Sequence, residues 1–445
     1  MLSDALHNSE SSDVLFVGGD GVKYLRPDIQ IWVESVRGES SHLCGANIYL
    51  QPKSNLELAL SLLLLDGLAR RIYLTPEGVG LPENEFNNLN SKLSIPQLGL
   101  LGLEAEIEIQ QLAAGVEVKT AWDGETQWIL ATSGTTNVPK FVCHTLNGLA
   151  RTVQTESKKG RSVCWGLLYD ISRFAGLQVF LQALLGGGTL ILTHENATVA
   201  DQLTHFVKND CNALSGTPTL WRKILMTPGA AELNLKLVTL GGEIAEQSVL
   251  DSLVKKFPNA KIRHIYASTE VGVGFSVSDV KEGFPASWFV NPPNGIELAL
   301  TESGCLKVKS TNIRQSYLTG GNILSDGGYA DTGDMIEIVE GRALFKGRAN
   351  GTINVGGNKV QPEEIEKVIH AVNGVAIAQV SGLANSMMGN LVVAKVVAHS
   401  GVDHAELKSS VMLACRSQLE AYERPAMLQI VEDVVISAVG KTQRK

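Results

Sequence analysis

An alternation of short apolar runs with helical segments constrains the fold of this chain more than any other feature. Two apolar runs at 47–50 and 70–75 flank a helical segment that has Ser54 or Asn55 as its N-cap and Gly67 at its C-terminal end. A strand, a helix and a second strand in this order imply parallel pairing of the two strands. The alternation recurs, with strand-like runs at 162–170, 187–193, 211–217, 235–242 and 261–268 and helical segments at 175–187, 198–209 and 245–258. The sequence therefore predicts a large α/β domain.

The pattern changes from about residue 295, where short strands alternate with glycine-rich turns. These strands cover 296–301, 305–310, 334–340 and 342–348, which predicts a small antiparallel sheet or a barrel-like subdomain. Pro362 then opens a helix, because proline suits the first helical turn. Two strands at 375–382 and 390–398 and a helix at 405–420 complete a compact α+β unit. We therefore expect an N-terminal domain over 1–348 and a smaller, mobile α+β domain over 349–445.

Composition narrows the class of protein. The net charge of −8 argues against a nucleic-acid partner, which would need a broad basic surface. The longest apolar run, at 58–65, is far too short to span a membrane. The first 13 residues are polar and acidic, without the features of a signal peptide, so we expect a cytoplasmic protein. Scattered cysteines without a CxxC pair indicate buried, reduced thiols; they are Cys44, Cys143, Cys164, Cys211, Cys305 and Cys415.

The stretch ATSGTTNVPK at 131–140 has the residue types of a phosphate-binding loop. A Walker loop is disfavoured, because Pro139 replaces its second glycine and Phe141 replaces the hydroxyl that binds magnesium. Hydroxyls, backbone N–H groups and one lysine can still wrap a diphosphate. The candidate ATP-binding residues here are Thr132, Ser133, Gly134, Thr135, Thr136 and Lys140. Taken alone, the stretch is also compatible with an ordinary turn rich in serine, threonine and glycine, although the phosphate-binding interpretation is favoured.

Five stretches in one order resemble the signatures of the adenylate-forming superfamily, in its acyl-CoA synthetase and ligase branch. They are TSGTTNVPK at 132–140, LGGE at 240–243, IYASTE at 265–270, YADTGD at 329–334 and AVGKTQRK at 438–445. Three positions depart from the family pattern, since Asn137 and Ala267 replace glycines and Asn350 replaces an aspartate or lysine. The resemblance implies the two-domain fold described above and the use of ATP and Mg²⁺.

The resemblance also implies roles for individual residues around the nucleotide. The turn Gly241, Gly242 and Glu243 would lie against adenine, and Tyr266 beside Ala267 would stack on it. Thr269 would touch the α-phosphate and Glu270 would coordinate Mg²⁺, with Thr136 as a further ligand. Asp334 would accept hydrogen bonds from the ribose hydroxyls, as an acceptor-only carboxylate can. Arg348 would reach the ribose or a phosphate, and Lys441 matches the catalytic lysine, which acts with Thr269 and Glu270.

The acid and thiol sites are implied by the same resemblance. Asn350 falls at the hinge about which the C-terminal domain rotates between the two half-reactions. The expected acyl and CoA pocket comprises Arg173, Phe174, Gly176, Val271, Gly272, Gly356 and Gly357. Arg173 has two interpretations: it pairs with a second polar group on the acid, or it forms a structural ion pair with Asp170.

The expected activity is an acyl-CoA synthetase, which converts a small carboxylic acid, ATP and CoA into acyl-CoA, AMP and pyrophosphate. A ligase of the same fold that uses the phosphopantetheine thiol of an acyl or peptidyl carrier protein is the first alternative. A protein that binds AMP without turnover is the second alternative, supported by Asn137, Ala267 and Asn350.

Overall fold

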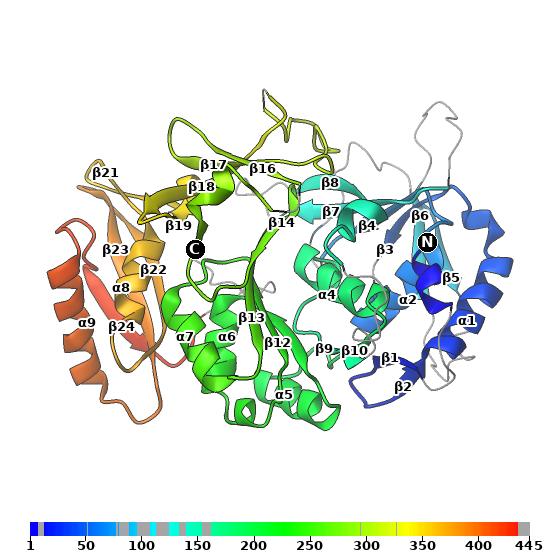
Figure 1. Cartoon of the computed structure of the whole chain (residues 1–445), viewed down its shortest axis with the longest axis horizontal. Helices are drawn as coiled ribbons and strands as arrows, with labels where there is room; N and C mark the ends of the chain where they lie inside the picture. The colour runs from blue at the N-terminus through cyan, green and yellow to red at the C-terminus, as the bar shows by residue number, and fades with distance from the viewer. Residues whose placement is uncertain are drawn as a thin grey trace.

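The computed structural model describes residues 1–7, 13–50, 52–76, 79, 89–95, 107–112, 124–132, 139–153, 162–293, 295–325 and 327–434. Three sheets with their helices form the larger part of the molecule, and a fourth sheet with two helices forms a small unit at one end (Figure 1). This arrangement confirms the α/β class and the division into a large and a small part. The expected phosphate-loop residues 133–138 and the tail with Lys441 lie outside the described residues.

The central sheet has eight strands, and its inner strands are parallel. The order across the sheet is β14 (Gly272–Val277), β13 (Lys261–Ser268), β12 (Leu237–Gly241), β11 (Ala213–Gly216), β9 (Cys164–Gly166), β10 (Thr189–Ile191), β1 (Val14–Val17) and β2 (Lys23–Leu25). A helix lies in the chain between each two successive strands of the series β9, β10, β11, β12 and β13, as the sequence alternation predicts.

A second sheet of six strands carries both ends of the loop at 133–138. Its order is β5 (Leu89–Ile95), β6 (Ile107–Leu112), β3 (Asn47–Leu50), β4 (Arg71–Leu74), β7 (Gln127–Thr132) and β8 (Lys140–Thr145). The strands expected at 47–50 and 70–75 are β3 and β4, and they pair in parallel as expected. β7 and β8 pair directly, with Thr132 opposite Lys140. The two ends of the loop are therefore held side by side.

The helices begin and end where local chemistry favours it. In α2 the hydroxyl of Ser54 accepts a 3.2 Å hydrogen bond from the N–H of Glu57, so Ser54 rather than Asn55 is the N-cap. Gly67 follows that helix with φ of +83°, a backbone conformation that favours glycine. The α-helices are α1 (Arg26–Glu39), α2 (Asn55–Leu65), α3 (Leu146–Leu149), α4 (Phe174–Leu185), α5 (Val199–Lys208), α6 (Pro218–Met226), α7 (Gln247–Lys256), α8 (Pro362–His370) and α9 (His404–Gln418). Short 3-10 turns are η1 (Leu2–Leu6), η2 (Ser41–Leu43), η5 (Pro228–Ala231), η6 (Ala286–Phe289) and η7 (Ala349–Gly351).

The region after residue 283 forms an antiparallel sheet of five strands, one of the two arrangements expected there. Its order is β15 (Phe284–Pro285), β19 (Arg342–Arg348), β18 (Ala330–Val339), β17 (Cys305–Lys309) and β16 (Glu297–Leu300). Val271, Phe275 and Phe284 belong to its buried core, which therefore includes residues of β14 and the turn before it. This packing joins the small sheet to the edge of the central sheet.

The C-terminal unit has its own hydrophobic core. Its sheet contains β21 (Asn358–Val360), β20 (Ile353–Val355), β23 (Gly389–Ala398), β22 (Val375–Asn385) and β24 (Met427–Val431). Ile365 and Ile369 of α8 are fully buried against this sheet, at about 2 kcal/mol for each side chain removed from water. η7 connects β19 to β20, at the position where the sequence predicted the domain boundary.

Two expectations from composition have direct structural outcomes. All six cysteines are free thiols, and Cys211, Cys305 and Cys415 are buried. The expectation of burial is wrong for Cys44, which is exposed in the short turn before β3, where no apolar periodicity forces it inward. Across the described ranges, no helix combines the length and the apolar character that crossing a bilayer requires.

Candidate active site

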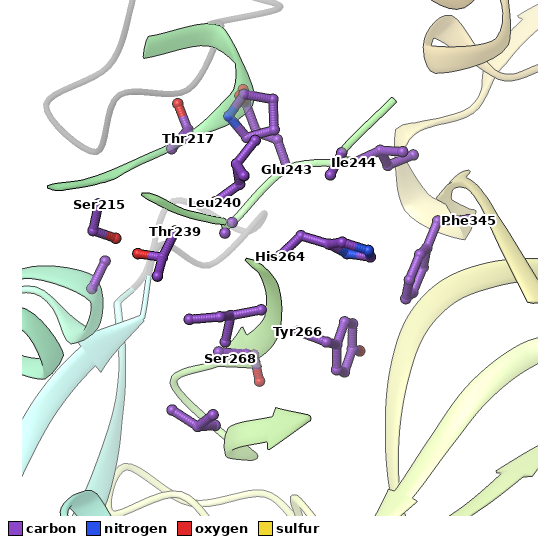
Figure 2. Close-up of a pocket in the computed structure, with 18 of the residues that line it drawn as sticks. Ser215, Thr217, Thr239, Leu240, Glu243, Ile244, His264, Tyr266, Ser268 and Phe345 are labelled. Atoms are coloured by element: carbon purple, nitrogen blue, oxygen red, sulfur yellow. The ribbon is translucent and has the colours of Figure 1, made fainter. Parts of the chain in front are cut away.

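A cavity of about 1310 Å³ lies where the parallel strands of the central sheet end. Ser215 and Thr217 come from the end of β11, and Thr239 and Glu243 from the end of β12 and the turn after it (Figure 2). Parallel strands direct their carboxyl ends to one edge of a sheet, which is where α/β proteins bind their ligands. The small sheet, the N-terminal half of α4 and the C-terminal unit supply the other walls.

Most of the described residues expected from the sequence line this one cavity. They are Thr132, Lys140, Arg173, Phe174, Gly241, Gly242, Glu243, Tyr266, Ala267, Thr269, Glu270, Asp334, Arg348 and Asn350. The expected residues Ser133, Gly134, Thr135, Thr136 and Lys441 lie outside the described residues. Five others are absent from the lining, namely Gly176, Val271, Gly272, Gly356 and Gly357.

Tyr266 joins β13 to the small sheet. Its hydroxyl donates a 2.6 Å hydrogen bond to Oδ2 of Asp334, and its ring stacks at 5.0 Å on Phe275 and at 5.3 Å on Phe345. Figure 2 shows the rings of Tyr266 and Phe345 as neighbours. Burial and the neighbouring carboxylate of Asp334 raise the pKa of Tyr266 well above its usual value, so the phenol stays protonated. In this arrangement Phe345 stands at the ring face that an adenine would otherwise contact.

Asp334 also forms an ion pair with Arg348. Nε of Arg348 lies 3.1 Å from Oδ1 of Asp334, and Nη2 of Arg348 donates a 2.8 Å hydrogen bond to the carbonyl of Thr332. One oxygen of Asp334 therefore faces a phenol and the other faces a guanidinium. This carboxylate is fixed in position before any ligand binds.

Glu270 and Lys140 lie on either side of Tyr317. The hydroxyl of Tyr317 donates a 3.3 Å hydrogen bond to Oε1 of Glu270, and Nζ of Lys140 sits 4.7 Å from the centre of the Tyr317 ring. Burial, followed by the charge of Glu270, raises the pKa of Tyr317 to about 12. The start of β8 and the turn after β13 therefore bring a cation and a carboxylate into one corner of the cavity.

This corner suits a magnesium ion that arrives with phosphates. In the described part of the chain, no group of three or more His, Cys, Asp and Glu side chains is arranged to hold a metal. Mg²⁺ in nucleotide enzymes commonly binds one or two carboxylates and completes its shell with water and phosphate oxygens. Glu270, lining the cavity beside Lys140, provides one such carboxylate.

The imidazole of His144 forms a hydrogen bond with the backbone of Thr269. Nε2 of His144 lies 2.8 Å from the carbonyl oxygen of Thr269, and the imidazole packs 6.1 Å from the ring of Phe174. Because a carbonyl only accepts, Nε2 carries the proton. Burial lowers the pKa of His144 to about 4, so the ring is neutral at pH 7. His144 thus connects β8 to the turn that carries Thr269 and Glu270.

The turn after β12 needs glycine at one position. Gly242 has φ of +82°, in the left-handed region that other residues rarely adopt. Oε2 of the next residue, Glu243, accepts a 3.0 Å hydrogen bond from the N–H of Thr219 at the start of α6. A carboxylate at a helix N-terminus is stabilised by the helix dipole. Glu243 therefore anchors the turn to α6 while the glycine backbone faces the cavity.

The expected acid-binding residues divide between the cavity wall and the packing around it. Arg173 precedes the first turn of α4, and its Nε lies 3.9 Å from Oδ2 of Asp170. Gly176 lets α4 approach the preceding loop, because a Cβ there would lie 2.1 Å from the carbonyl oxygen of Asp170. Val271 is buried in the core of the small sheet, and Gly272 has φ of +74° in the turn into β14.

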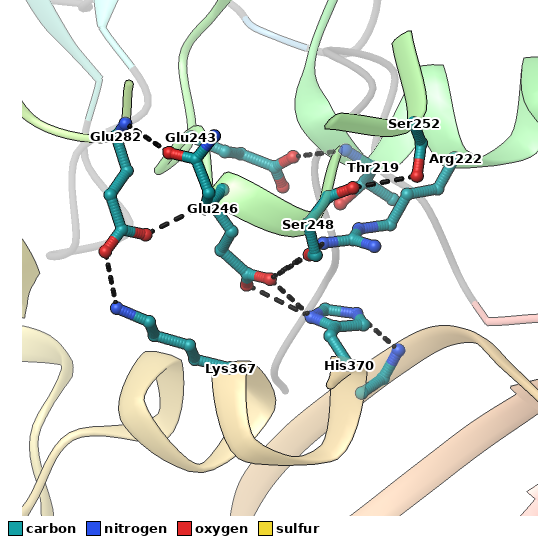
Figure 3. Close-up of polar contacts among 11 residues, drawn as sticks. Thr219, Arg222, Glu243, Glu246, Ser248, Ser252, Glu282, Lys367 and His370 are labelled. Carbon is teal, nitrogen blue, oxygen red and sulfur yellow. Dashed lines mark hydrogen bonds and ion pairs between the residues drawn. The ribbon is translucent and has the colours of Figure 1, made fainter. Parts of the chain in front are cut away.

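A buried polar network attaches the C-terminal unit to the wall of the cavity (Figure 3). Nη2 of Arg222 on α6 lies 2.7 Å from Oε2 of Glu246, and Nδ1 of His370 on α8 lies 3.0 Å from Oε1 of Glu246. The backbone N–H of Ala378 donates a 2.9 Å hydrogen bond to Nε2 of His370. Nε2 is thus an acceptor and Nδ1 carries the proton, so the ring is neutral. Burial lowers the pKa of His370, in agreement with this assignment.

The glycine pair of the C-terminal unit lies away from the cavity in this arrangement. Gly356 and Gly357 form the exposed turn between β20 and β21, with φ of +57° and +89°. Met388 packs beside Gly356, where a Cβ would lie 2.5 Å from its terminal methyl. Asn350 in η7, by contrast, is exposed and lines the cavity.

Several residues of the site lie outside the motifs and were not predicted from the sequence. For His144 the sequence offers a weak indication, since it is a polar residue at an inward position of β8. Glu246, His370, Tyr317 and Phe345 lie outside the motif stretches. They reach the site through contacts between distant segments, such as the 124-residue separation between Glu246 and His370.

Family models and curated relatives match long stretches of this chain. The model of the AMP-binding enzyme family matches residues 83–307, and that of the AMP-binding enzyme C-terminal domain matches residues 364–441. D-alanine–D-alanyl carrier protein ligase of Staphylococcus epidermidis is 25% identical over 338 residues, which cover 72% of this chain and 70% of that protein. Surfactin synthase subunit 2 of Bacillus subtilis is 25% identical over 352 residues; the match covers 71% of this chain and only 10% of that protein.

Solved structures share the fold over nearly the whole chain. The Bacillus subtilis o-succinylbenzoate CoA synthetase, solved with its acyl-adenylate intermediate, has a TM-score of 0.69 at 17% identity and covers 100% of this chain and 96% of its own. The anthranilate CoA ligase AuaEII, solved with anthranoyl-AMP, has a TM-score of 0.69 at 15% identity, with 100% and 95% covered. At these identities the likeness concerns the fold.

Proposed function

Because the chain belongs to the AMP-binding enzyme family and is an adenylate-forming ligase, we propose that it is an acyl-CoA synthetase. It activates a carboxylic acid with ATP as an acyl-adenylate, releases pyrophosphate, and transfers the acyl group to the thiol of CoA with release of AMP. The observation that carries this proposal is that residues from four separate motifs line one cavity, represented by Lys140, Glu243, Glu270 and Asp334.

The charges of the site suit the first half-reaction. A carboxylate that approaches the α-phosphorus of ATP brings negative charge to a centre that is already anionic, so cations and fixed donors are the main requirement. Lys140 and Arg348 both line the cavity and supply positive charge. Glu270 would hold Mg²⁺, which neutralises phosphate charge when it is bound. Asp334, fixed by Tyr266 and Arg348, would bind the ribose hydroxyls.

Lys441 is proposed as the catalytic lysine that contacts the acid and the α-phosphate together. Val434, the last described residue, packs in a cluster with Ala376 and Met226, the last residue of α6. Lys441 follows it by seven positions, and an extended chain of that length spans at most about 25 Å. The C-terminal tail therefore starts at the interface that borders the cavity.

The second half-reaction is proposed to follow a rotation of the C-terminal unit about Asn350. The turn at Gly356 and Gly357 is exposed and has no Cβ atoms, so a thiol arm can approach its backbone closely after such a rotation. In the observed arrangement, the hydrogen bond of His370 to Glu246 and the ion pair of Lys367 with Glu282 hold the unit in place.

A carrier protein is the alternative thiol donor, favoured by the similarity to D-alanine–D-alanyl carrier protein ligase. Both acceptors use a phosphopantetheine thiol, so the test has to offer them separately. The fold neighbours suggest o-succinylbenzoate and anthranilate as first members of an acid panel.

The experiment incubates the purified protein with ATP, Mg²⁺ and each acid, and adds either CoA or a phosphopantetheinylated carrier protein. We expect acyl-CoA, AMP and pyrophosphate in equal amounts with at least one acid. Thioester on the carrier alone would replace the CoA assignment with the carrier alternative. Bound AMP without acid-dependent pyrophosphate release would contradict catalysis itself.

A further inference from the structure

A buried arginine nitrogen on the acid side of the cavity lacks a hydrogen-bond partner. Arg173 lines the cavity with 23% of its side chain exposed, and its Nε is buried without a partner in the described part of the chain. Buried polar groups in native proteins are normally satisfied, and a buried charge without partners is costly. An unsatisfied guanidinium nitrogen in a binding cavity therefore needs an explanation.

Asp170 does not satisfy Arg173. The distance of 3.9 Å from Nε to Oδ2 gives an ion pair but exceeds hydrogen-bond length. Both oxygens of Asp170 are already engaged, since Oδ1 accepts from the N–H of Ser172 at 2.8 Å and Oδ2 from its hydroxyl at 2.6 Å. The ion pair expected from the sequence is thus present, yet it leaves the donors of Arg173 available.

A second arginine lies on the same wall. Nη2 of Arg151 donates to the carbonyls of Val273 and Gly274 at the start of β14, and Arg151 lines the cavity. Nε2 of Gln178 on α4 donates a 3.0 Å hydrogen bond to the carbonyl of Leu149, two residues before Arg151. This bond places the cavity face of α4, which begins beside Arg173, next to the turn that carries Arg151. Arginine stays charged even where burial lowers its pKa.

Two side chains in contact connect Thr269 to the start of α4, where Arg173 lies. The first is His144 and the second is Phe174, the neighbour of Arg173. Val273, which accepts from Arg151, follows Glu270 by three residues. The wall around the arginines also contains Trp165, so an apolar segment of ligand fits between the two polar ends.

We propose that Arg173, assisted by the positive charge of Arg151 in the same cavity lining, binds a second carboxylate of the acid substrate, so that the preferred substrate is a dicarboxylic acid activated at one end only. The guanidinium fork matches a carboxylate in two-point geometry, and burial strengthens the interaction. Asp170 and Ser172 then serve to orient Arg173. This inference rests on the proposed function, because it assigns the far end of the same acid site.

The test uses straight-chain and aryl acids in matched pairs. One member of each pair carries a second carboxylate, and the other carries a primary carboxamide at the same carbon. Acid-dependent pyrophosphate exchange into ATP is measured for the wild type, Arg173→Met, Arg173→Lys and the control Arg416→Met, which changes an exposed arginine on α9. In the best pair we expect kcat/KM for the diacid to exceed that for the amide by about 10- to 100-fold. Arg173→Met removes this preference, Arg173→Lys keeps part of it, and Arg416→Met leaves it unchanged.

Equal or better use of the amides by the wild type, or a diacid preference that survives in Arg173→Met, overturns the inference while leaving the proposed function intact. Exchange that is absent with every acid overturns the proposed function. In that case, calorimetric titration of the same acid pairs still tests the arginine site, because it measures binding without turnover. Diacid binding that is lost in Arg173→Met and retained in Arg416→Met supports the site, and binding that is absent or equal in both variants overturns it.

Discussion

Tyr266 and Asp334 are 68 residues apart in the sequence and are joined by a 2.6 Å hydrogen bond from the phenol to the carboxylate. The bond connects the end of a central strand to the small sheet at the point where the ribose of a nucleotide would lie. A carboxylate held by a neutral donor on one oxygen and by Arg348 on the other is oriented before substrate arrives. The site is therefore preorganised on the nucleotide side.

Tyr266→Phe keeps the stacked ring and removes only the hydroxyl. We expect the KM for ATP to rise by about 10-fold with a smaller change in kcat, because Asp334 loses the donor that orients it. Tyr329→Phe is the matched control, since it removes a hydroxyl that donates to Glu297 outside the cavity. Steady-state kinetics with varied ATP measure this change. If the KM for ATP rose equally in both variants, the orientation of Asp334 would not be the cause.

Glu270→Gln removes the carboxylate proposed to hold Mg²⁺ while keeping the side chain's size. We expect acid-dependent pyrophosphate exchange to fall by about 10²- to 10³-fold, the usual cost of one charge-stabilising group. The Mg²⁺ concentration for half-maximal rate should rise as well. Glu302→Gln, at an exposed position of the small sheet, is the control. An unchanged Mg²⁺ requirement in Glu270→Gln would contradict the metal assignment.

His144 makes the free energy of unfolding depend on pH. Its pKa is about 4 in the folded protein and about 6.5 when unfolded, so the unfolded chain takes up the proton first as the pH falls. Stability from this group is complete above about pH 6.5 and declines towards pH 4, with a limiting slope of about 1.4 kcal/mol per pH unit. Denaturant unfolding between pH 4.5 and 7 measures it. His144→Gln should be less stable at pH 7 and show a flatter pH dependence, and parallel curves would contradict the prediction.

Glu246→Ala breaks the polar network between the cavity wall and the C-terminal unit. We expect a loss of about 3 kcal/mol in the free energy of unfolding, because Arg222 remains buried without its partner. Lys367→Met removes the more exposed pair with Glu282 and should cost less than about 1 kcal/mol. Thermal and denaturant unfolding compare the two variants. Similar small costs in both would show that the Glu246 network does not hold the unit in place.

The sequence was sufficient for the fold class, because its signal is local. Apolar runs such as those of β3 and β4 alternate with capped helices, and that alternation leads directly to a parallel sheet. Part of the cavity lining could be predicted for the same reason, since motif residues such as Glu243 and Thr269 come shortly after strands.

The rest depended on contacts between distant segments. Nothing near Tyr266 in the sequence indicates that Phe345 stacks on its ring, and nothing near His370 indicates Glu246 as its partner. The exposed state of Cys44 likewise follows from its place in a short turn before a strand, where residue type alone suggested burial. Local periodicity determines the helices and strands. The way in which the sheets and the two units pack against one another determines which distant side chains form pairs.

The measurement that tests the central claim most directly is exchange of labelled pyrophosphate into ATP by the wild type and by Lys441→Ala. The account predicts exchange only when a carboxylic acid is present, and its loss in Lys441→Ala, while that variant still converts a supplied acyl-adenylate and CoA into acyl-CoA. Exchange without any acid, or equal loss of both half-reactions in Lys441→Ala, would contradict it.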